Sequence, residues 1–359
     1  MKRVIGAKEK EVACMGTLTN NLHLMMDSFY NPTAERYKIL CEAKAFPSDQ
    51  YAFASQVRAH GLDPSTAILE VFPREGEYSL REEDIMEIIA KEGSSIALVL
   101  FSGVQYYTGQ LFPMQNITQK AKEQGCICGW DLAHAVGNVP LSLHDWDVDF
   151  AVWCTYKYLN SGPGGIAGIF MHEKWNNIQL PKFAGWWGHE LSTRFQMPPT
   201  FSPIAGAQGF QQSNPCILAL ASLLGSLRVF KEAGMLTPVR ERSLLLTGTL
   251  EKLLVKSDYF VFLDQLRQLY PQAGSGKPGF TIITPADPDQ RGAQLSLLIL
   301  PAESGLMHKI FASLSDYGVI GDEREPDVIR LAPNPLYNTI HDCEQAAQYL
   351  EQAFKLIGA

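Results

Sequence analysis

The sequence predicts an α/β fold with a mainly parallel sheet, followed by a smaller α+β domain at the C-terminus. Short, almost uninterrupted apolar runs alternate with helical patterns over the first two thirds of the chain. This alternation is typical of parallel strands that helices cover on both faces. After about residue 236 the order changes to helix, two strands, helix, strand and helix. We therefore expect a large domain over residues 1–235 and a small domain over residues 236–359, in agreement with the length of 359 residues.

The individual elements follow from apolar periodicity and from the glycines that end helical patterns. The strands expected in the large domain are 37–41, 95–101, 126–130, 150–154 and 166–170. The helices expected there are 48–60, 113–124 and a long one that begins after Pro215. The elements expected in the small domain are a helix from 236, strands 280–283, 294–300 and 328–331, and helices 306–317 and 343–356.

Composition and charge exclude several classes of protein. The chain is 46% hydrophobic and 19% charged, which excludes disorder over its whole length. Its net charge of −8 and the lack of a basic stripe argue against nucleic acid or an anionic membrane as a partner. The longest apolar stretch, residues 217–230, contains an arginine and is too short to span a bilayer. The first residues lack the apolar run of a secretory leader, so we expect a cytoplasmic protein with a small-molecule substrate.

The seven cysteines argue against a metal or disulfide framework. Their number is odd, and no two are spaced as CxxC. Several lie in apolar runs, where buried free thiols are common. We expect no metal site, and we expect free thiols in a reducing compartment.

Lys157 and Asp131 are the strongest candidates for chemistry, because each follows a buried strand of the predicted sheet. In open α/β sheets ligands bind at the carboxyl ends of the strands, where these two residues would lie about one strand–helix–strand step apart. A partly desolvated lysine suits Schiff-base chemistry, and an acid nearby can keep the ring nitrogen of pyridoxal phosphate (PLP) protonated. The simpler alternatives are a surface lysine, an Asp131 that caps a helix and a structural His134.

A phosphate site is expected at residues 15–21, where a glycine and hydroxyl residues precede an apolar helical run. A plain threonine N-cap would explain the same pattern, and Phe46 could be a core residue or a stacking platform. Residues 162–167 fit a loose GxGxxA dinucleotide pattern, but a strand rather than a helix follows them. We expect the glycines there to let the backbone pass close behind Lys157.

Several segments together resemble the kynureninase family, PLP enzymes with the aminotransferase-like fold (fold type I). They are TLTNNLH (17–23), EAKAFPSDQYA (42–52), LFSGVQYYTGQ (100–110), WDLAHAVGN (130–138), YKYLNSGPGG (156–165), WWGHELSTRF (186–195), QQSNP (211–215) and IRLAPNPLYN (329–338). Members normally carry a longer segment before the stretch that matches residues 1–13. We expect this chain to lack that segment, which contributes to substrate contacts and to the dimer interface.

The resemblance implies a role for each matching residue. Lys157 would bind the cofactor covalently and move the Cα proton, and Tyr156 would act as an acid–base residue. Arg330 would bind the substrate carboxylate, and Asn214 would help to recognise the substrate ring. Trp186 and Asn214 would reach the site of a second subunit in a homodimer. The cofactor-binding residues would be Leu18, Thr19, Phe46, Pro47, Ser48, Asp49, Ser102, Asp131, His134, Tyr156, Lys157, Trp186 and Asn214.

The activity implied is hydrolytic cleavage of the Cβ–Cγ bond of kynurenine or 3-hydroxykynurenine, giving anthranilate or 3-hydroxyanthranilate and alanine. This reaction belongs to tryptophan catabolism and NAD biosynthesis. Two alternatives stay open at this point. One is another PLP enzyme, such as an aminotransferase or a cysteine desulfurase relative. The other is an impaired form that serves only as a partner subunit.

Overall fold

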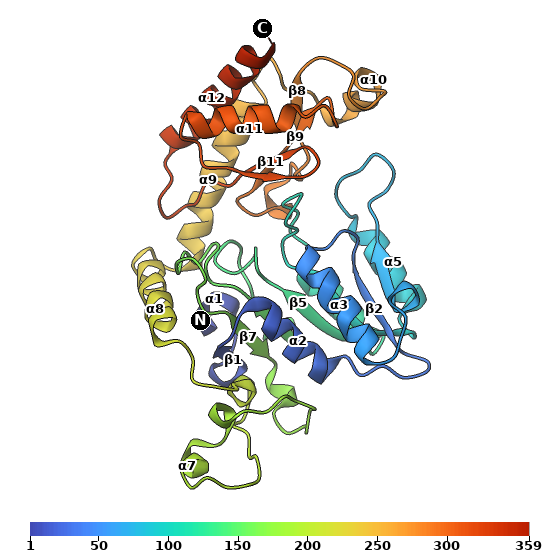
Figure 1. The fold of residues 1–359 in the computed structure, drawn as a ribbon, viewed down its shortest axis with the longest axis vertical. Helices are drawn as coiled ribbons and strands as arrows, with labels where there is room; N and C mark the ends of the chain where they lie inside the picture. Colours follow the sequence, from blue (N-terminus) through green and yellow to red (C-terminus); the bar gives the residue numbers. More distant parts are fainter. Residues whose placement is uncertain (359) are drawn as a thin grey trace. The chain divides into compact units, whose positions relative to one another are not determined.

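A computed structural model describes residues 1–358 and divides them into two compact units (Figure 1). Unit 1 contains residues 1–104 and 112–236, and unit 2 contains residues 105–111 together with the chain from Thr237 onward. The structure thus groups residues 105–111, which the sequence analysis placed in the large domain, with the second unit. No helix among the described residues combines the length and the apolar character that crossing a membrane requires.

Unit 1 is built on a seven-stranded sheet with the order β1-β7-β6-β5-β4-β2-β3. Strands β3, β2, β4, β5 and β6 pair in parallel, whereas β7 pairs antiparallel with β6 and β1. The prediction of a mainly parallel α/β sheet is therefore confirmed. The strands are β1 (Val12–Cys14), β2 (Lys38–Glu42), β3 (Ile68–Val71), β4 (Ile96–Ser102), β5 (Ile127–Asp131), β6 (Phe150–Trp153) and β7 (Gly168–Met171).

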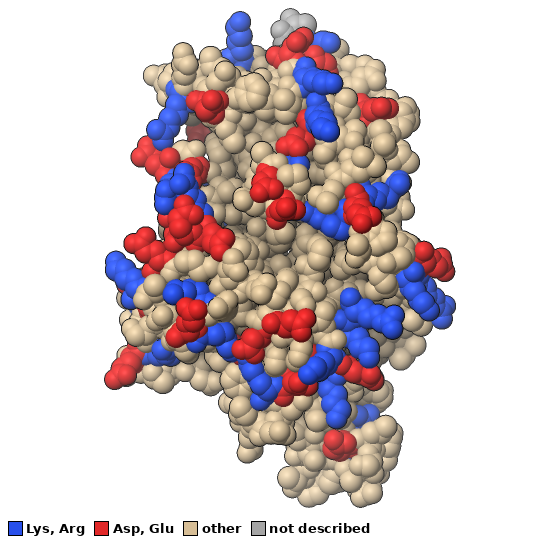
Figure 2. All heavy atoms as spheres, turned by 180° about the vertical axis from the view of Figure 1, so that it is seen from behind, with Lys and Arg blue, Asp and Glu red and all other residues tan. Residues whose placement is uncertain are grey.

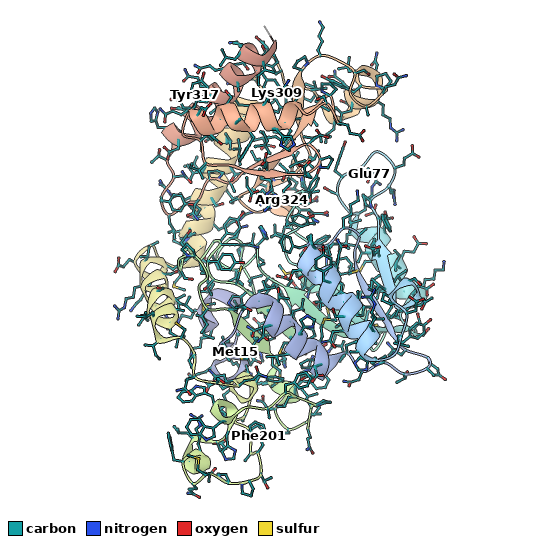
Figure 3. All side chains as sticks on the ribbon, viewed as in Figure 1. Met15, Glu77, Phe201, Lys309, Tyr317 and Arg324 are labelled. Carbon is teal, nitrogen blue, oxygen red and sulfur yellow. The ribbon has the colours of Figure 1, made fainter. Side chains whose placement is uncertain are left out.

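Helices cover both faces of this sheet. Buried residues of α2 (Leu18–Phe29) and α3 (Pro47–Ala59) form one apolar cluster with the strands. α6 (Met114–Glu123) lies against β5, where the Trp130 indole donates a hydrogen bond to Thr118 Oγ1 at 3.0 Å. The other helices of unit 1 are α1 (Lys2–Ile5), α4 (Pro64–Ala67), α5 (Glu82–Glu92), α7 (Leu191–Arg194) and α8 (Ile217–Glu232), with 3-10 turns at Glu9–Glu11, Glu173–Trp175, Trp186–Gly188 and Ala207–Phe210. Met15, labelled in Figure 3, is buried just before α2 begins.

Unit 2 has its own antiparallel sheet, with the order β10-β11-β9-β8. Its core joins this sheet to three long helices, and stacked Tyr317 and Tyr349 link two of them with ring centroids 4.8 Å apart. The strands are β8 (Gly279–Ile282), β9 (Leu295–Leu300), β10 (Asp322–Arg324) and β11 (Val328–Leu331). The helices are α9 (Leu236–Leu254), α10 (Leu266–Leu269), α11 (Leu306–Asp316) and α12 (Ile340–Gly358), with 3-10 turns at Leu263–Gln265 and Pro288–Gln290.

The differences from the sequence prediction are helix α5, which was not predicted, several short elements and the glycine loop. Strands β1, β3 and β10 have three or four residues each and were not predicted, because so short a run carries no clear periodicity. The expected close approach behind Lys157 is wrong for Gly162 and Gly164, since a Cβ on either would meet nothing within 4 Å. Glycine is favoured there because φ is +91° and +66°.

Candidate active site

Lys157 lies in the loop that follows β6, next to residues from two other elements. Its Nζ is 3.1 Å from His134 Nε2 and 5.7 Å from the centre of the Phe46 ring. His134 follows β5, and Phe46 is the N-cap residue of α3. The carboxyl ends of neighbouring parallel strands meet at one edge of a sheet, which explains how residues more than one hundred positions apart come together. The structure thus brings Lys157, His134 and Phe46 together, as the sequence analysis expected.

Two buried carboxyl groups, Asp131 and Asp49, form the acidic part of this edge. Asp131 is the last residue of β5 and is 4% exposed, whereas Asp49 lies in the first turn of α3 and is 2% exposed. Burial and the neighbouring charge of Asp131 raise the pKa of Asp49 well above its usual range, and the two side chains are hydrogen-bonded. Because two carboxylates cannot share a hydrogen bond without a proton, the pair retains a proton, and the direction of the pKa shifts favours Asp49 as the group that holds it.

Asp131 also has a structural role, which the sequence left open as the simpler alternative to a chemical one. Its Oδ1 accepts a hydrogen bond from the Ala133 amide at 2.7 Å, which holds the turn after β5. This bond and the Lys157 ammonium lower the pKa of Asp131, but burial outweighs them and raises it overall. The turn contact fixes the carboxylate in place, so the structural role and a role toward a cofactor are compatible.

The N-termini of α2 and α3 lie side by side at the place expected for phosphate. Thr19 Oγ1 and Ser48 Oγ are 2.6 Å apart and join the two first turns. Thr17 is the N-cap residue of α2, yet its side chain makes no capping hydrogen bond. Two helix N-termini together offer unpaired backbone N–H groups and the positive ends of two helix dipoles. This arrangement is suited to a dianionic group.

Tyr156 and Ser102 complete the set of residues near the carboxyl edge. Tyr156 is 46% exposed, and burial of its hydroxyl, with a smaller contribution from Cys154, raises its pKa to about 12. Tyr156 therefore keeps its proton at neutral pH and can donate it. Ser102 ends β4 and pairs in register with Asp131.

Glu42 is a residue of this edge that the sequence analysis missed. It ends β2, is 2% exposed and accepts a hydrogen bond from Ser102 Oγ at 2.5 Å. A carboxyl group at the end of a buried strand is the same signal that identified Asp131. The predicted strand, residues 37–41, stops one residue before Glu42, so this carboxyl group was not recognised as lying at the strand end.

Arg330, the expected carboxylate ligand, lies on β11 in unit 2. Its side chain is 8% exposed, donates to Tyr106 O at 2.6 Å and forms an ion pair with Asp322 on β10. The guanidinium is thus already engaged by a protein carboxylate, so a substrate carboxylate would have to compete with Asp322.

Trp186 and Asn214 both belong to unit 1. Trp186 donates to Arg194 O at 3.2 Å and packs edge-on against Phe195. Asn214 is exposed. Their predicted roles in a second subunit therefore stay predictions.

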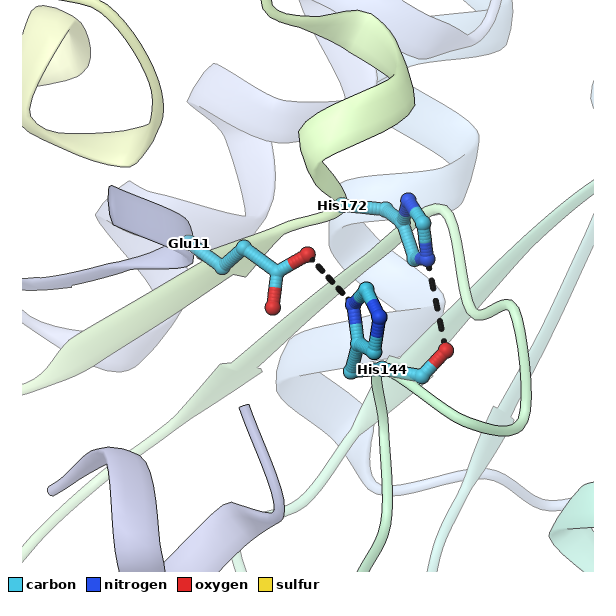
Figure 4. A group of neighbouring side chains, drawn as sticks. All are labelled: Glu11, His144 and His172. Carbon is cyan, nitrogen blue, oxygen red and sulfur yellow. Dashed lines mark hydrogen bonds and ion pairs between the residues drawn. The ribbon is translucent and has the colours of Figure 1, made fainter. Parts of the chain in front are cut away.

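A second cluster, outside this edge, consists of Glu11, His144 and His172 (Figure 4). The ring planes of the two histidines are stacked, with centroids 4.7 Å apart. Glu11 Oε1 lies 2.8 Å from His144 Nδ1 and accepts from the Glu173 amide, and His172 Nδ1 accepts from the Lys174 amide. Since these atoms already have protein partners, we assign the cluster to holding the chain segments around residues 11, 144 and 172 together.

Two comparisons with known proteins define the class. The family model described as Aminotransferase class-V matches residues 2–261, and the one described as Kynureninase C-terminal domain matches residues 239–350. Among solved structures, a cysteine desulfurase from Thermococcus onnurineus superposes with a TM-score of 0.75 at 17% identity, covering 99% of this chain and 82% of that one. A C-DES mutant with glycine linked to its PLP cofactor gives a TM-score of 0.79 at 14% identity, covering 98% and 83%. The chain is therefore a class-V aminotransferase-fold protein, a PLP-dependent class.

Curated relatives define the family within that class. The kynureninase of Yarrowia lipolytica is 53% identical over 354 residues, covering 99% of this chain and 80% of the relative. Those of Nematostella vectensis and Rattus norvegicus are 55% and 53% identical, covering 99% and 95% of this chain and 74% and 70% of the relatives. The chain belongs to the kynureninase family.

The described residues fit the cofactor of this family. Asp49 Oδ1 is buried and has no hydrogen-bond partner among the described residues, and it lies beside the ionised Asp131. An unpaired acceptor next to a buried negative charge suits a protonated ring nitrogen. Lys157 offers the amine that binds an aldehyde, and the two helix N-termini suit a phosphate.

We expect the Glu11–His144–His172 cluster to make stability depend on pH. Burial and the nearby Lys174 lower the pKa of His172, so the folded state disfavours its protonation. A histidine with a lowered pKa stabilises the fold above its unfolded pKa, about 6.5, and this contribution is lost as the pH falls. The free energy of unfolding from urea titration should decline below about pH 6.5 in the wild type, and less in His172→Gln.

The matched control is His341→Gln, because the His341 side chain is 72% exposed. This variant should keep the wild-type decline. An identical decline in His172→Gln and the wild type would exclude the role given to His172.

Proposed function

We propose that this chain hydrolyses L-kynurenine and 3-hydroxy-L-kynurenine to anthranilate or 3-hydroxyanthranilate and L-alanine. The observation that carries the proposal is the position of Lys157 beside His134, Phe46 and the Asp49–Asp131 pair, in a chain of the kynureninase family. Because the chain belongs to the kynureninase family, an aminotransferase or a cysteine desulfurase activity is not favoured.

Each residue of the carboxyl edge has a defined task in this proposal. Bound PLP supplies an electron sink for the Cα of the substrate. Asp131 would stabilise the positive charge on the ring nitrogen, and Lys157 would hold the cofactor through its amine and move the Cα proton. Leu18, Thr19 and Ser48 bind the phosphate through the first turns of their helices, beside Pro47. Phe46 stacks on the ring, and His134 orients the Lys157 amine at 3.1 Å.

Tyr156 is suited to the proton transfers of C–C bond cleavage. Its phenol is protonated at neutral pH and therefore has a proton to donate to the atom on which negative charge develops. Arg330 binds the α-carboxylate of the substrate with its planar guanidinium, and Asn214 contributes to recognition of the substrate ring.

We further propose that the protein is a cytoplasmic homodimer. Its seven cysteines are free thiols, as is common in a reducing compartment. α8 begins with two exposed apolar side chains, Ile217 and Leu218, which are 71% and 80% exposed. A large apolar surface on a single chain is typical of an interface, and the side seen in Figure 2 carries acidic and basic residues interspersed. Trp186 and Asn214 would then serve the partner's site.

The first test is product formation by the purified chain with PLP and 3-hydroxykynurenine. We expect 3-hydroxyanthranilate from the wild type, and a loss of at least about 10³-fold in kcat from Lys157→Ala, because no other group can replace the covalent amine. Lys91→Ala, an exposed lysine of α5, is the matched control and should keep full activity. Turnover by Lys157→Ala at the control rate would overturn the proposal.

Arg330 and Asp322 should affect KM in opposite directions. Arg330→Gln removes a charge-assisted contact to the substrate and should raise KM by about tenfold or more. Asp322→Asn removes the competing carboxylate and should lower KM, with little effect on PLP affinity in either variant. Steady-state kinetics with kynurenine measures both values. A KM that Arg330→Gln leaves unchanged would exclude Arg330 as the carboxylate ligand.

The homodimer predicts a specific effect of charge on α8. Leu218→Asp introduces a carboxylate where an interface would be apolar, and sedimentation velocity should then show a monomer in place of the wild-type dimer. Asp258→Asn, a charge change in unit 2, is the control and should leave the mass unchanged. A wild type that sediments as a monomer at micromolar concentration would refute the proposed dimer.

A further inference from the structure

Glu42 is a buried carboxyl group that has no role in the reaction proposed above. It ends β2, between β3 and β4 in the sheet, and only 2% of the residue is exposed. A carboxyl group at such a position is costly unless it is hydrogen-bonded or neutral. The contacts of Glu42 therefore indicate what it does.

The partner of Glu42 is Ser102, the last residue of β4. The Ser102 hydroxyl donates to Glu42 Oε1 at 2.5 Å, and the Ser102 amide lies 3.3 Å from each carboxyl oxygen. Ser102 pairs in register with Asp131 at the end of β5. Glu42, Ser102 and Asp131 thus form a row along the carboxyl ends of β2, β4 and β5, which are neighbours in the sheet.

Charged and titratable groups face this row from several elements. The charge of Asp131 on β5 raises the pKa of Glu42. Glu42 in turn raises the pKa of Asp49 on α3 and of the Cys41 thiol. Val71 is the β3 residue in register with Glu42 and carries no charge. Lys157 is the cation that lowers the pKa values of Asp49 and Asp131. Lys157 thus acts on two of the three buried carboxyl groups, whereas Glu42 has the Ser102 hydrogen bonds and, among the described residues, no cation that lowers its pKa.

We propose that Glu42 is a positioning residue for the bound cofactor, which fixes the Ser102 hydroxyl and adds negative charge beside Asp131 when it ionises. The proposal rests on PLP binding at Lys157, as proposed above. Glu42 acts through Ser102 and Asp131 and need not touch the cofactor itself.

The titration of Glu42 falls in the physiological range. Burial raises its pKa to about 7, against the lowering effect of the Ser102 hydrogen bond. Below neutral pH Glu42 is neutral, and above it the added charge favours a protonated ring nitrogen at Asp131. PLP should therefore bind more tightly as the pH rises through about 7. This increase in affinity should be absent when Glu42 cannot ionise.

The test is the dissociation constant of PLP, measured by fluorescence quenching of the cofactor-free protein between about pH 6 and pH 8.5. Glu42→Gln keeps the size of the side chain and removes its ionisation. The ratio of its dissociation constant to that of the wild type should be near one at the acidic end. It should increase by about three- to tenfold at the basic end, since each unit of pKa shift is worth a factor of ten.

Two further variants keep the result interpretable. Glu70→Gln removes an exposed carboxylate from neighbouring β3 and should leave the ratio near one at every pH. Ser102→Ala keeps Glu42 but deletes the hydrogen bond that lowers its pKa. The midpoint of the pH dependence should therefore move upward in Ser102→Ala, which tests the proposal even if Glu42→Gln does not fold.

A ratio that does not change with pH, or an unmoved midpoint in Ser102→Ala, would overturn the role of Glu42. A wild type that does not bind PLP, or whose binding Lys157→Ala leaves unaltered, would instead contradict the proposed function. The two failures are therefore distinguishable in the same experiment.

Discussion

The hydrogen-bonded carboxyl pair of Asp49 and Asp131 is the constraint on which the candidate active site depends. Two acids held against each other in a buried position store unfavourable electrostatic energy, which proteins tolerate when a proton or a cation compensates it. The raised pKa of Asp49 favours a proton on that group, and the positive charge of Lys157 lowers the pKa of both acids. A site with this excess of acid is prepared for a cationic ring rather than for a neutral ligand. This pair is the acidic group beside Lys157, His134 and Phe46, and it makes their arrangement suited to a cationic ring.

The scaffold explains why the pair can persist. Asp131 is anchored by the backbone amide of Ala133, and Asp49 is held in place by the first turn of α3. Burial outweighs these contributions, since the pKa of each group is raised overall. A rigid parallel sheet is therefore needed to hold them, because a flexible loop would relax and admit water.

Much of this arrangement could be predicted from the sequence. The strand that ends at Asp131 and the strand that precedes Lys157 are apolar runs of four or five residues, and such runs are visible without a structure. The register of β4 and β5, which pairs Ser102 with Asp131, could not be predicted, because strand pairing depends on contacts between distant segments. The position of Glu42 at a strand end is a local signal, but its hydrogen bond to Ser102, sixty residues away along the chain, could not be predicted.

Arg330 shows a different limit of sequence reasoning. The resemblance assigns it to a substrate carboxylate, and the structure gives it a protein carboxylate, Asp322 on the adjacent strand β10. The two assignments are compatible if the protein carboxylate holds the guanidinium ready and yields to the substrate. Asp322 can yield because its side chain is 42% exposed, so that water solvates it once the pair separates. A fully buried partner would have to leave an uncompensated charge behind, and exchange would then be unfavourable. The exposure of Asp322 is therefore what would allow Arg330 to bind the substrate as proposed while it also supports the fold.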